Sequence, residues 1–276
     1  MNQQDSPVLV LGATGKTGRR VVDRLRARGR PVRAGSRRST TPFDWQAPAT
    51  WAPALAGADA VYVSFFPDLA VPEAPTAIEE LVAIARGVGV RRLVLLSGRG
   101  EANARRCEAI VGSSGLSHTI VRASWFDQNF DEGHLLGGVL DGIVAMPADR
   151  VREPFVDCDD IADVAVAALC DDGHDGELYE VTGPRLLTFA DAVAAIARAS
   201  GRELDYLPIS LDDFRTALAA DAGPALANLL TELCREVLDG RNESLGDGVE
   251  RALGRAPRDF ADWARGAAAT GVWAQR

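Results

Sequence analysis

The sequence predicts an α/β fold: a doubly wound, Rossmann-type parallel sheet with a smaller, mainly helical C-terminal region. The apolar segment 8–11 runs into a glycine loop and then into a helix over 16–29, which is how a dinucleotide-binding fold begins. Short apolar runs and helical segments then alternate along the first half of the chain. That alternation is typical of parallel strands joined by crossover helices.

The glycine loop has the spacing Gly12, Gly15 and Gly18. The first glycine permits a tight turn, the second lets the backbone approach a pyrophosphate, and the third allows close packing of the helix. Phosphates would then face N–H groups at the positive end of that helix. The alternative is an ordinary glycine turn. The side chains that add donors in the loop are Thr14, Lys16 and Thr17.

The end of the second strand, expected over 32–35, indicates which dinucleotide is bound. A cofactor without the 2′-phosphate is usually held by a carboxylate about 20 residues past the loop. Ser36, Arg37 and Arg38 stand there instead, and arginine suits bidentate contacts with phosphate. We expect NADP(H), the alternative being that these arginines belong to a solvated loop.

The later elements follow from the same patterns. A short helix ends near Gly57, and the segment 127–152 is predicted to be a mobile helix and loop rather than core. Asp159 and Asp160 begin a helix, where acids suit the positive end. Strands are expected over 60–64, 93–97, 117–122, 155–157 and 178–181. Helices are expected over 74–87, 103–111, 161–169 and 189–199, the last of them capped by Thr188. From residue 210 onward the chain is expected to be helical, including the amphipathic stretch 225–238.

These elements predict three regions. Residues 1–150 form the NADP(H)-binding core, 151–182 add further core elements, and 183–276 form a helical region that caps the substrate. Ligands of such sheets bind outside the carboxyl ends of the strands. The residues just after each strand are therefore the candidates for the site.

Composition narrows the classes of partner. The chain has 276 residues, a net charge of −9 and a pI near 4.9, which argues against nucleic acid or an acidic membrane as partner. We find no signal segment at its start and no apolar run of about 18 residues, so we expect a cytoplasmic protein. We also expect a monomer or a weak homodimer. The four cysteines show no metal-ligand spacing and are expected to be reduced.

Aromatic residues follow two strands and predict an apolar pocket for a flat, polycyclic small molecule. Ordinary core packing is the alternative, and we expect it to account for at least two of them. Asn129 belongs to the same segment. The aromatic residues are Phe65, Phe66, Trp125, Phe126 and Phe130, of which Phe65 and Phe66 are also candidate cofactor contacts.

Few side chains are placed to assist catalysis. Ser97 ends the fourth strand, where it could contact the cofactor and hold a substrate carbonyl, or satisfy local backbone. His134 lies near the expected pocket and could donate a proton at neutral pH, or be a surface residue. Arg122 is expected to be a structural hydrogen-bonding residue. Asp157, with the two acids after it, is explained by the helix N-terminus better than by a metal, and we expect no metal site.

Several segments together resemble the NmrA-like branch of the atypical short-chain dehydrogenase/reductases. Within that branch the chain is similar to bacterial proteins that resemble ergot-alkaloid imine reductases and atypical ketoreductases of aromatic polyketide pathways. The resemblance reaches to about Phe260 and implies a substrate pocket near Trp125 and Phe126. The segments are 12–18, 51–61, 114–122, 125–130, 154–162 and 179–184, and the implied NADP(H) contacts are Gly12, Thr14, Gly15, Lys16, Thr17, Arg37 and Phe65.

The chain departs from the family in its catalytic segment. Ordinary members carry a Tyr-x-x-x-Lys pair, but the only lysine here is Lys16, inside the glycine loop, and the segment 98–108 has no tyrosine. Losing a general acid costs about 10²–10⁴-fold in rate. A substrate that is already electrophilic can still be reduced at such a reduced rate, so the missing pair does not exclude turnover.

We therefore expect an NADPH-dependent reductase of a ketone or imine of a bulky aromatic natural product, such as an aromatic polyketide, in secondary metabolism such as antibiotic biosynthesis. The alternative is a non-catalytic NADP(H)-binding redox sensor that acts through a protein partner. A redox-neutral isomerase that uses the cofactor transiently is a third, weaker interpretation.

Overall fold

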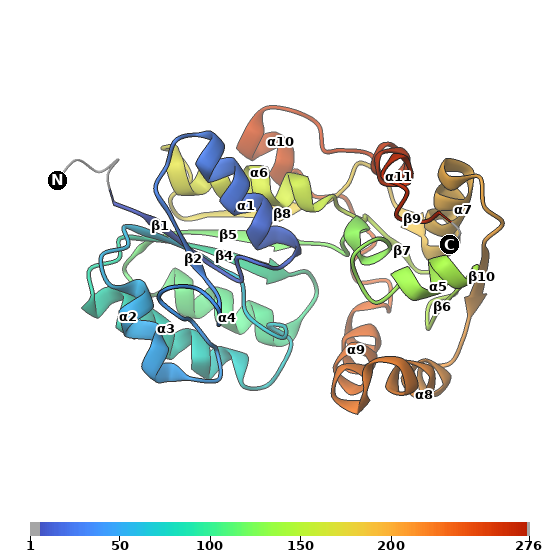
Figure 1. Ribbon diagram of the computed structural model, residues 1–276, viewed down its shortest axis with the longest axis horizontal. Helices are drawn as coiled ribbons and strands as arrows, with labels where there is room; N and C mark the ends of the chain where they lie inside the picture. The colour runs from blue at the N-terminus through green and yellow to red at the C-terminus, as the bar shows by residue number, and fades with distance from the viewer. Residues whose placement is uncertain (1–5, 275–276) are drawn as a thin grey trace. The chain divides into compact units, whose positions relative to one another are not determined.

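A six-stranded parallel sheet forms the centre of the first of two compact units. In the computed structural model, which describes residues 6–274, every neighbouring pair in this sheet runs parallel. This confirms the doubly wound fold (Figure 1). In the order β2-β1-β3-β4-β5-β8, the strands are β2 (Val32–Gly35), β1 (Val8–Leu11), β3 (Ala60–Val63), β4 (Arg92–Gly98), β5 (Ser117–Ala123) and β8 (Glu177–Val181).

The strand order reverses direction at β1. The chain runs from β1 to β2 on one side and then returns to β3 on the other side. In open α/β sheets, ligands bind at the carboxyl ends of the strands at such a switch point. The loops after β1 and β3 are therefore where the fold itself directs a ligand.

Helices cover both faces of this sheet (Figure 1). Leu9, Leu11 and Val61 are fully buried against the helices of one face, and full burial of such a side chain contributes about 1.5–3 kcal/mol. Tyr62 follows Val61 in β3, and its side chain therefore faces the opposite side of the sheet. One face is covered by α1 (Lys16–Ala27), α6 (Cys158–Cys170) and α10 (Gly248–Leu253). The other face is covered by α2 (Trp51–Leu55), α3 (Ala74–Gly87) and α4 (Ala102–Gly112). A 3-10 turn, η1 (Pro48–Thr50), leads into α2.

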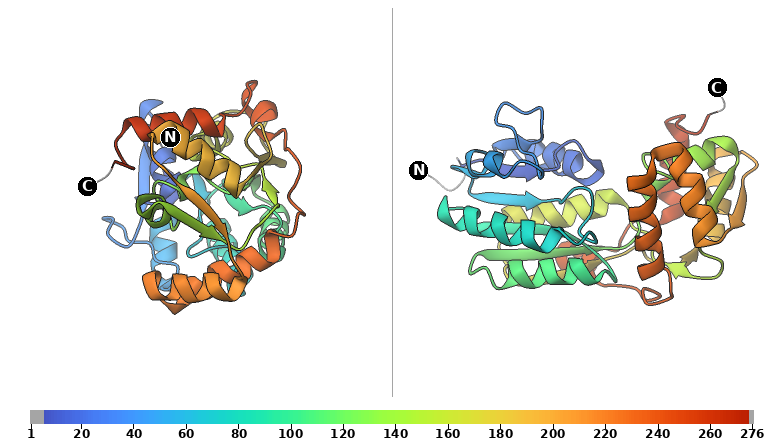
Figure 2. Two further views of the ribbon diagram at one scale, coloured as in Figure 1. Left: turned by 90° about the vertical axis from the view of Figure 1, so that its right-hand side faces the viewer. Right: turned by 90° about the horizontal axis from the view of Figure 1, so that it is seen from below.

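The second unit is mainly helical and has its own aromatic core. Phe130 and Phe189 are fully buried there, and the Trp273 indole donates to the Phe130 carbonyl at 3.0 Å. Helices α8 and α9 lie side by side (Figure 2). The elements are η2 (Asp127–Asn129), α5 (Leu136–Asp141), β6 (Ile143–Met146), β7 (Arg152–Glu153), β9 (Leu187–Thr188), α7 (Phe189–Ser200), β10 (Asp205–Pro208), α8 (Leu211–Ala222), α9 (Pro224–Val237) and α11 (Phe260–Ala269).

Two predictions about this part of the chain are wrong. The segment 127–152 was expected to be a helix and loop rather than core; it does contain the helix α5, but Phe130, Val139 and Met146 are buried in the core of the second unit. The segment 155–157 is not a strand. Only Val156 makes an isolated bridge, to Phe126, while the nearby strand β7 pairs with β9. The parallel ribbon of β6 and β10 had no clear strand signal in the sequence.

The division of the chain differs from the three consecutive regions that we expected. The first unit comprises the residues up to Ala123, together with Cys158–Val181 and Asp247–Arg255. The second comprises Ser124–Asp157, Thr182–Gly246 and the residues from Ala256 onward. The chain leaves the first unit directly after β5 and returns to it for α6 and β8. No helix of the described residues is long and apolar enough to cross a membrane.

Candidate functional site

The glycine loop after β1 has the geometry of a phosphate cradle. Gly12 has a φ of +67°, which the turn out of the strand requires, and a Cβ on Gly18 would lie 2.1 Å from the Gly12 carbonyl oxygen. Gly15 is the N-cap of α1 and provides no side-chain cap. Glycine at this position leaves the positive helix terminus open to an anion. Thr14 and Gly15 are exposed there, whereas Thr17 is buried.

The turn after β2 presents two exposed cations. Arg37 and Arg38 are solvent-exposed, and the turn that carries them is held by Ser36, whose carbonyl accepts from Ser39 Oγ at 2.7 Å. Arg33 is different, because its guanidinium donates to two carbonyls near α2, at 2.7 Å each. The turn thus offers two guanidinium groups, and no carboxylate is present in residues 36–41.

An aromatic cluster fixes the loop after β3. The ring of Phe65 lies 4.6 Å from that of Trp45, and the Trp45 indole donates to the Ser64 carbonyl at 3.1 Å. Phe43 and Trp51 complete this cluster behind the loop. Phe66 is instead 65% exposed. The two adjacent phenylalanines, expected together as cofactor contacts, therefore have different surroundings, and Phe66 presents its ring to solvent.

Ser97 is held in a buried charged network. Its hydroxyl donates to Glu108 Oε1 at 2.6 Å, and the guanidinium of Arg122 donates to both oxygens of the same carboxylate, at 2.9 and 2.5 Å. Glu180 accepts from Arg122 at 2.9 Å and forms an ion pair with Arg99 at 3.3 Å. These carboxylates raise the pKa of Arg122. The only proton of the Ser97 hydroxyl is therefore directed at Glu108, and we do not assign Ser97 as a proton donor.

A carboxyl pair that the sequence interpretation did not single out lies at the same edge of the sheet. Asp68, in the loop after β3, is in hydrogen-bonding contact with Glu101, which is the N-cap of α4. Glu101 is only 7% exposed. The available signal was the occurrence of one acid shortly after each of two strands that prove to be neighbours.

Of the residues predicted to form the substrate pocket, Trp125, Phe126, Asn129 and Phe130 lie in the second unit, whereas Phe65 and Phe66 lie in the first. Trp125 and Phe126 are half-buried, and the rings of Phe189 and His134 contact Trp125 at 5.7 and 6.2 Å. Asn129 ends the 3-10 turn η2 and is half-buried. Phe130 is fully buried among core aromatic rings. Core packing thus accounts for Phe130, while Trp125 and Phe126 are only half-buried.

The acids at the start of α6 are paired with arginines. Asp159 accepts from Arg24 at 2.7 Å, and Asp160 accepts from Arg255, also at 2.7 Å. Within the described residues, no group of three or more His, Cys, Asp or Glu side chains could hold a metal ion. The four cysteines are free thiols, and all four lie in helices.

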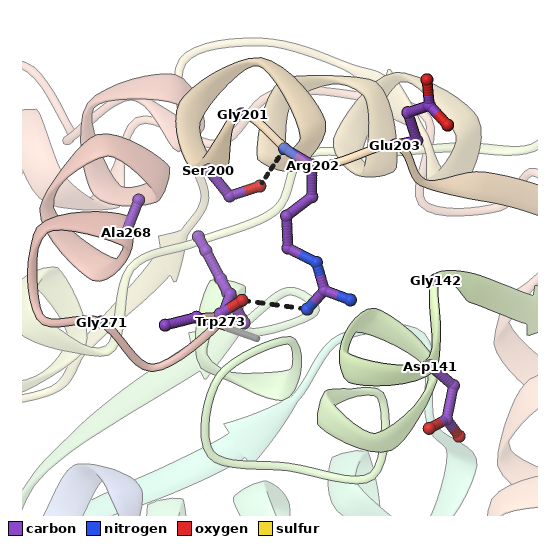
Figure 3. A pocket seen from close by; sticks show the side chains of 10 residues that line it. Asp141, Gly142, Ser200, Gly201, Arg202, Glu203, Ala268, Gly271 and Trp273 are labelled. Atoms are coloured by element: carbon purple, nitrogen blue, oxygen red, sulfur yellow. Dashed lines mark hydrogen bonds between the residues drawn. The ribbon is translucent and has the colours of Figure 1, made fainter. Parts of the chain in front are cut away.

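A hollow of about 650 Å³ lies in the second unit. Arg202 extends into it and donates to the Trp273 carbonyl at 2.9 Å (Figure 3). It also donates to the Leu140 carbonyl at 2.6 Å. None of the predicted site residues lines it. The hollow surrounds an arginine that ties α5 to the C-terminal segment, and we assign it no ligand.

Comparison with known proteins gives a consistent result. Residues 12–172 match the model of a family described as NAD(P)H-binding. A Streptomyces griseus (4-alkanoyl-5-oxo-2,5-dihydrofuran-3-yl)methyl phosphate reductase is 33% identical over 93% of this chain and 96% of its own. An agroclavine dehydrogenase of Claviceps fusiformis is 26% identical over 93% of this chain and 95% of its own.

The fold also has solved relatives. The structure of NmrA, described as a negative transcriptional regulator in complex with NAD, superposes with a TM-score of 0.72 at 17% identity and covers 95% of each chain. At this level of identity the likeness concerns the fold alone. The two relatives in sequence are named as a reductase and a dehydrogenase, and the similarity covers nearly the whole length of each.

Proposed function

The chain belongs to the NAD(P)H-binding, NmrA-like atypical short-chain dehydrogenase/reductases and is an NAD(P)H-dependent oxidoreductase, and we propose that it uses NADPH to reduce a ketone or imine of a bulky aromatic metabolite. The observation that carries this proposal is the open glycine cradle at the end of β1, followed by two exposed arginines at the end of β2. Together they suit a pyrophosphate and a 2′-phosphate.

The residues present fit the cofactor. Gly12, Gly15 and Gly18 form the cradle, and the guanidinium groups of Arg37 and Arg38 would hold the 2′-phosphate. The bound cofactor supplies hydride, and the protein must position the substrate and manage one proton. The further candidate contacts are Thr14, Lys16, Thr17, Ser36, Phe65 and Phe66.

The aromatic surfaces support a flat substrate. Phe66 is largely exposed in the first unit, and Trp125 and Phe126 are half-buried in the second. Such surfaces suit a polycyclic ketone or imine, of the kind made in secondary metabolism such as antibiotic biosynthesis. The sensor alternative is not favoured, because the full-length relatives named above are reductases or dehydrogenases.

The test is NADPH oxidation by the purified protein against a panel of polycyclic ketones, quinones and cyclic imines, with NADH in parallel. We expect turnover of at least one ketone or imine with a preference for NADPH. Tight NADPH binding without turnover of any member would refute the proposed substrate class. Turnover of quinones alone would show that the reactive group is different.

A further inference from the structure

Two carboxyl groups meet at the carboxyl edge of the sheet in the first unit. Asp68 follows β3 and Glu101 follows β4, and these two strands are parallel neighbours. The loop that carries Asp68 is fastened to α4, because the Asn103 side chain donates to the Ala70 carbonyl at 2.8 Å. The pair therefore lies on the edge where this fold binds its ligands.

Gly98 makes room for the pair. It is the last residue of β4, and a Cβ placed on it would lie 1.8 Å from Glu101 Oε1 and 2.2 Å from the carboxyl carbon. Any other residue at this position would displace the Glu101 carboxyl from the strand end. The close approach of a buried carboxyl to backbone at the ligand edge is thus a feature that this particular glycine permits.

The pair can form only if it holds a proton. Two ionised carboxylates repel each other, and a hydrogen bond between them requires one to be protonated. Burial raises the pKa of Asp68, while the Ala70 N–H and Glu101 act in the opposite direction. Glu101 acts on Asp68 through their hydrogen bond, and on the α4 side burial, followed by the nearby Glu108, raises the pKa of the Cys107 thiol.

We propose that the Asp68–Glu101 pair donates the proton that completes the reduction, a role for which the chain has no Tyr-x-x-x-Lys pair. This inference rests on the proposed function. The substrate carbon accepts hydride from the bound cofactor, which is oxidised, and the C=O or C=N electron pair moves to the oxygen or nitrogen. That atom takes the shared proton to give the alcohol or amine, and the doubly charged pair regains a proton from water.

Other groups are less suited to this role. The Ser97 hydroxyl donates to Glu108, and Arg122 is saturated by two carboxylates. Asp68 is half-buried, whereas Glu101 is nearly fully buried, so Asp68 is the member of the pair that we expect water to reprotonate. The pair combines a held proton with a route to solvent, which is what a general acid that turns over repeatedly needs.

The first test uses the ligand-free protein and does not depend on turnover. Infrared spectroscopy at neutral pH distinguishes the C=O stretch of a protonated carboxyl from the bands of carboxylates. We expect this acid band in the wild type and in the control Glu80→Gln, an exposed glutamate of α3. Asp68→Asn and Glu101→Gln should each remove it. Absence of the band in the wild type, or its survival in both variants, would overturn the proposal.

The second test measures kcat with the substrate that the panel identifies. Asp68→Asn and Glu101→Gln should lower kcat by about 10²–10⁴-fold without changing NADPH affinity. We expect kcat of the wild type to decline at high pH, where the pair loses its proton, and both variants should lack this decline. Gly98→Ala, which only displaces the Glu101 carboxyl, should lower kcat in the same way. Rates within about tenfold of wild type in Asp68→Asn and Glu101→Gln would exclude the pair as donor. A panel without turnover would refute the proposed function, and the infrared band would still decide whether the pair holds a proton.

Discussion

Replacing Arg122 with leucine should destabilise the first unit strongly. The Glu108 side chain is 7% exposed, and Arg122 donates to both of its oxygens. Without the guanidinium, this carboxylate keeps only the Ser97 hydroxyl among these partners. The substitution therefore leaves an ionised group buried with a single neutral donor.

The magnitude follows from that geometry. Removing one partner of a buried ion pair costs about 3–5 kcal/mol, whereas a whole domain is stable by about 5–15 kcal/mol. Arg122→Leu should thus remove a large share of the free energy of unfolding. The double variant Arg122→Leu/Glu108→Leu buries no charge at this point and should recover most of the loss, because apolar residues often replace a buried pair without penalty.

Urea denaturation followed by circular dichroism measures both effects. The double-mutant cycle gives the interaction energy of the pair directly. A loss below about 1 kcal/mol in Arg122→Leu would show that Glu108 is solvated or otherwise satisfied. A double variant no more stable than the single one would show that the loss in Arg122→Leu does not come from an unpaired Glu108 carboxylate.

Three further predictions concern separate parts of the chain. Arg37→Ala/Arg38→Ala should weaken NADPH binding by roughly 1.5–3 kcal/mol per lost charged hydrogen bond and leave NADH binding almost unchanged; equal losses in calorimetric titrations would contradict the 2′-phosphate assignment. Burial raises the pKa of Cys234 from 9.0 to about 12, so the unfolded thiol ionises first. The folded state should lose about 1.4 kcal/mol relative to Cys234→Ala between neutral pH and about pH 10, and parallel urea curves would argue against this. Thr188 accepts from the Asp191 N–H at 3.0 Å in a capping box, so Thr188→Ala should lower the unfolding free energy by about 0.5–2 kcal/mol; an unchanged midpoint would show that packing alone holds α7.

The first unit was largely predictable because its signals are local. The strands Val8–Leu11 and Val32–Gly35 and the helix Ala74–Gly87 have the expected bounds, since each is a short apolar run or a helical stripe bounded by glycine. The cap at Thr188 also follows from local sequence. Such elements need no knowledge of distant contacts.

The second unit was less predictable because its core is built from segments far apart in sequence. Phe130 is buried by Phe155 and Phe260, and no local period reveals that contact. Within residues 6–274, the strand β6 pairs only with β10, more than sixty residues further on. The Asp68–Glu101 pair was missed for the same reason, because only the neighbouring positions of β3 and β4 bring the two acids together.

The measurement that tests the central claim most directly follows the hydride itself. The protein is given NADPH deuterated at C4 of the nicotinamide, on either face, with a ketone or imine from the panel, and the product is analysed by mass spectrometry. The account predicts that cofactor of one facial configuration transfers a single deuterium to the former carbonyl or imine carbon. NADPH oxidation without deuterium in the product, or a bound cofactor that is never oxidised, would contradict it.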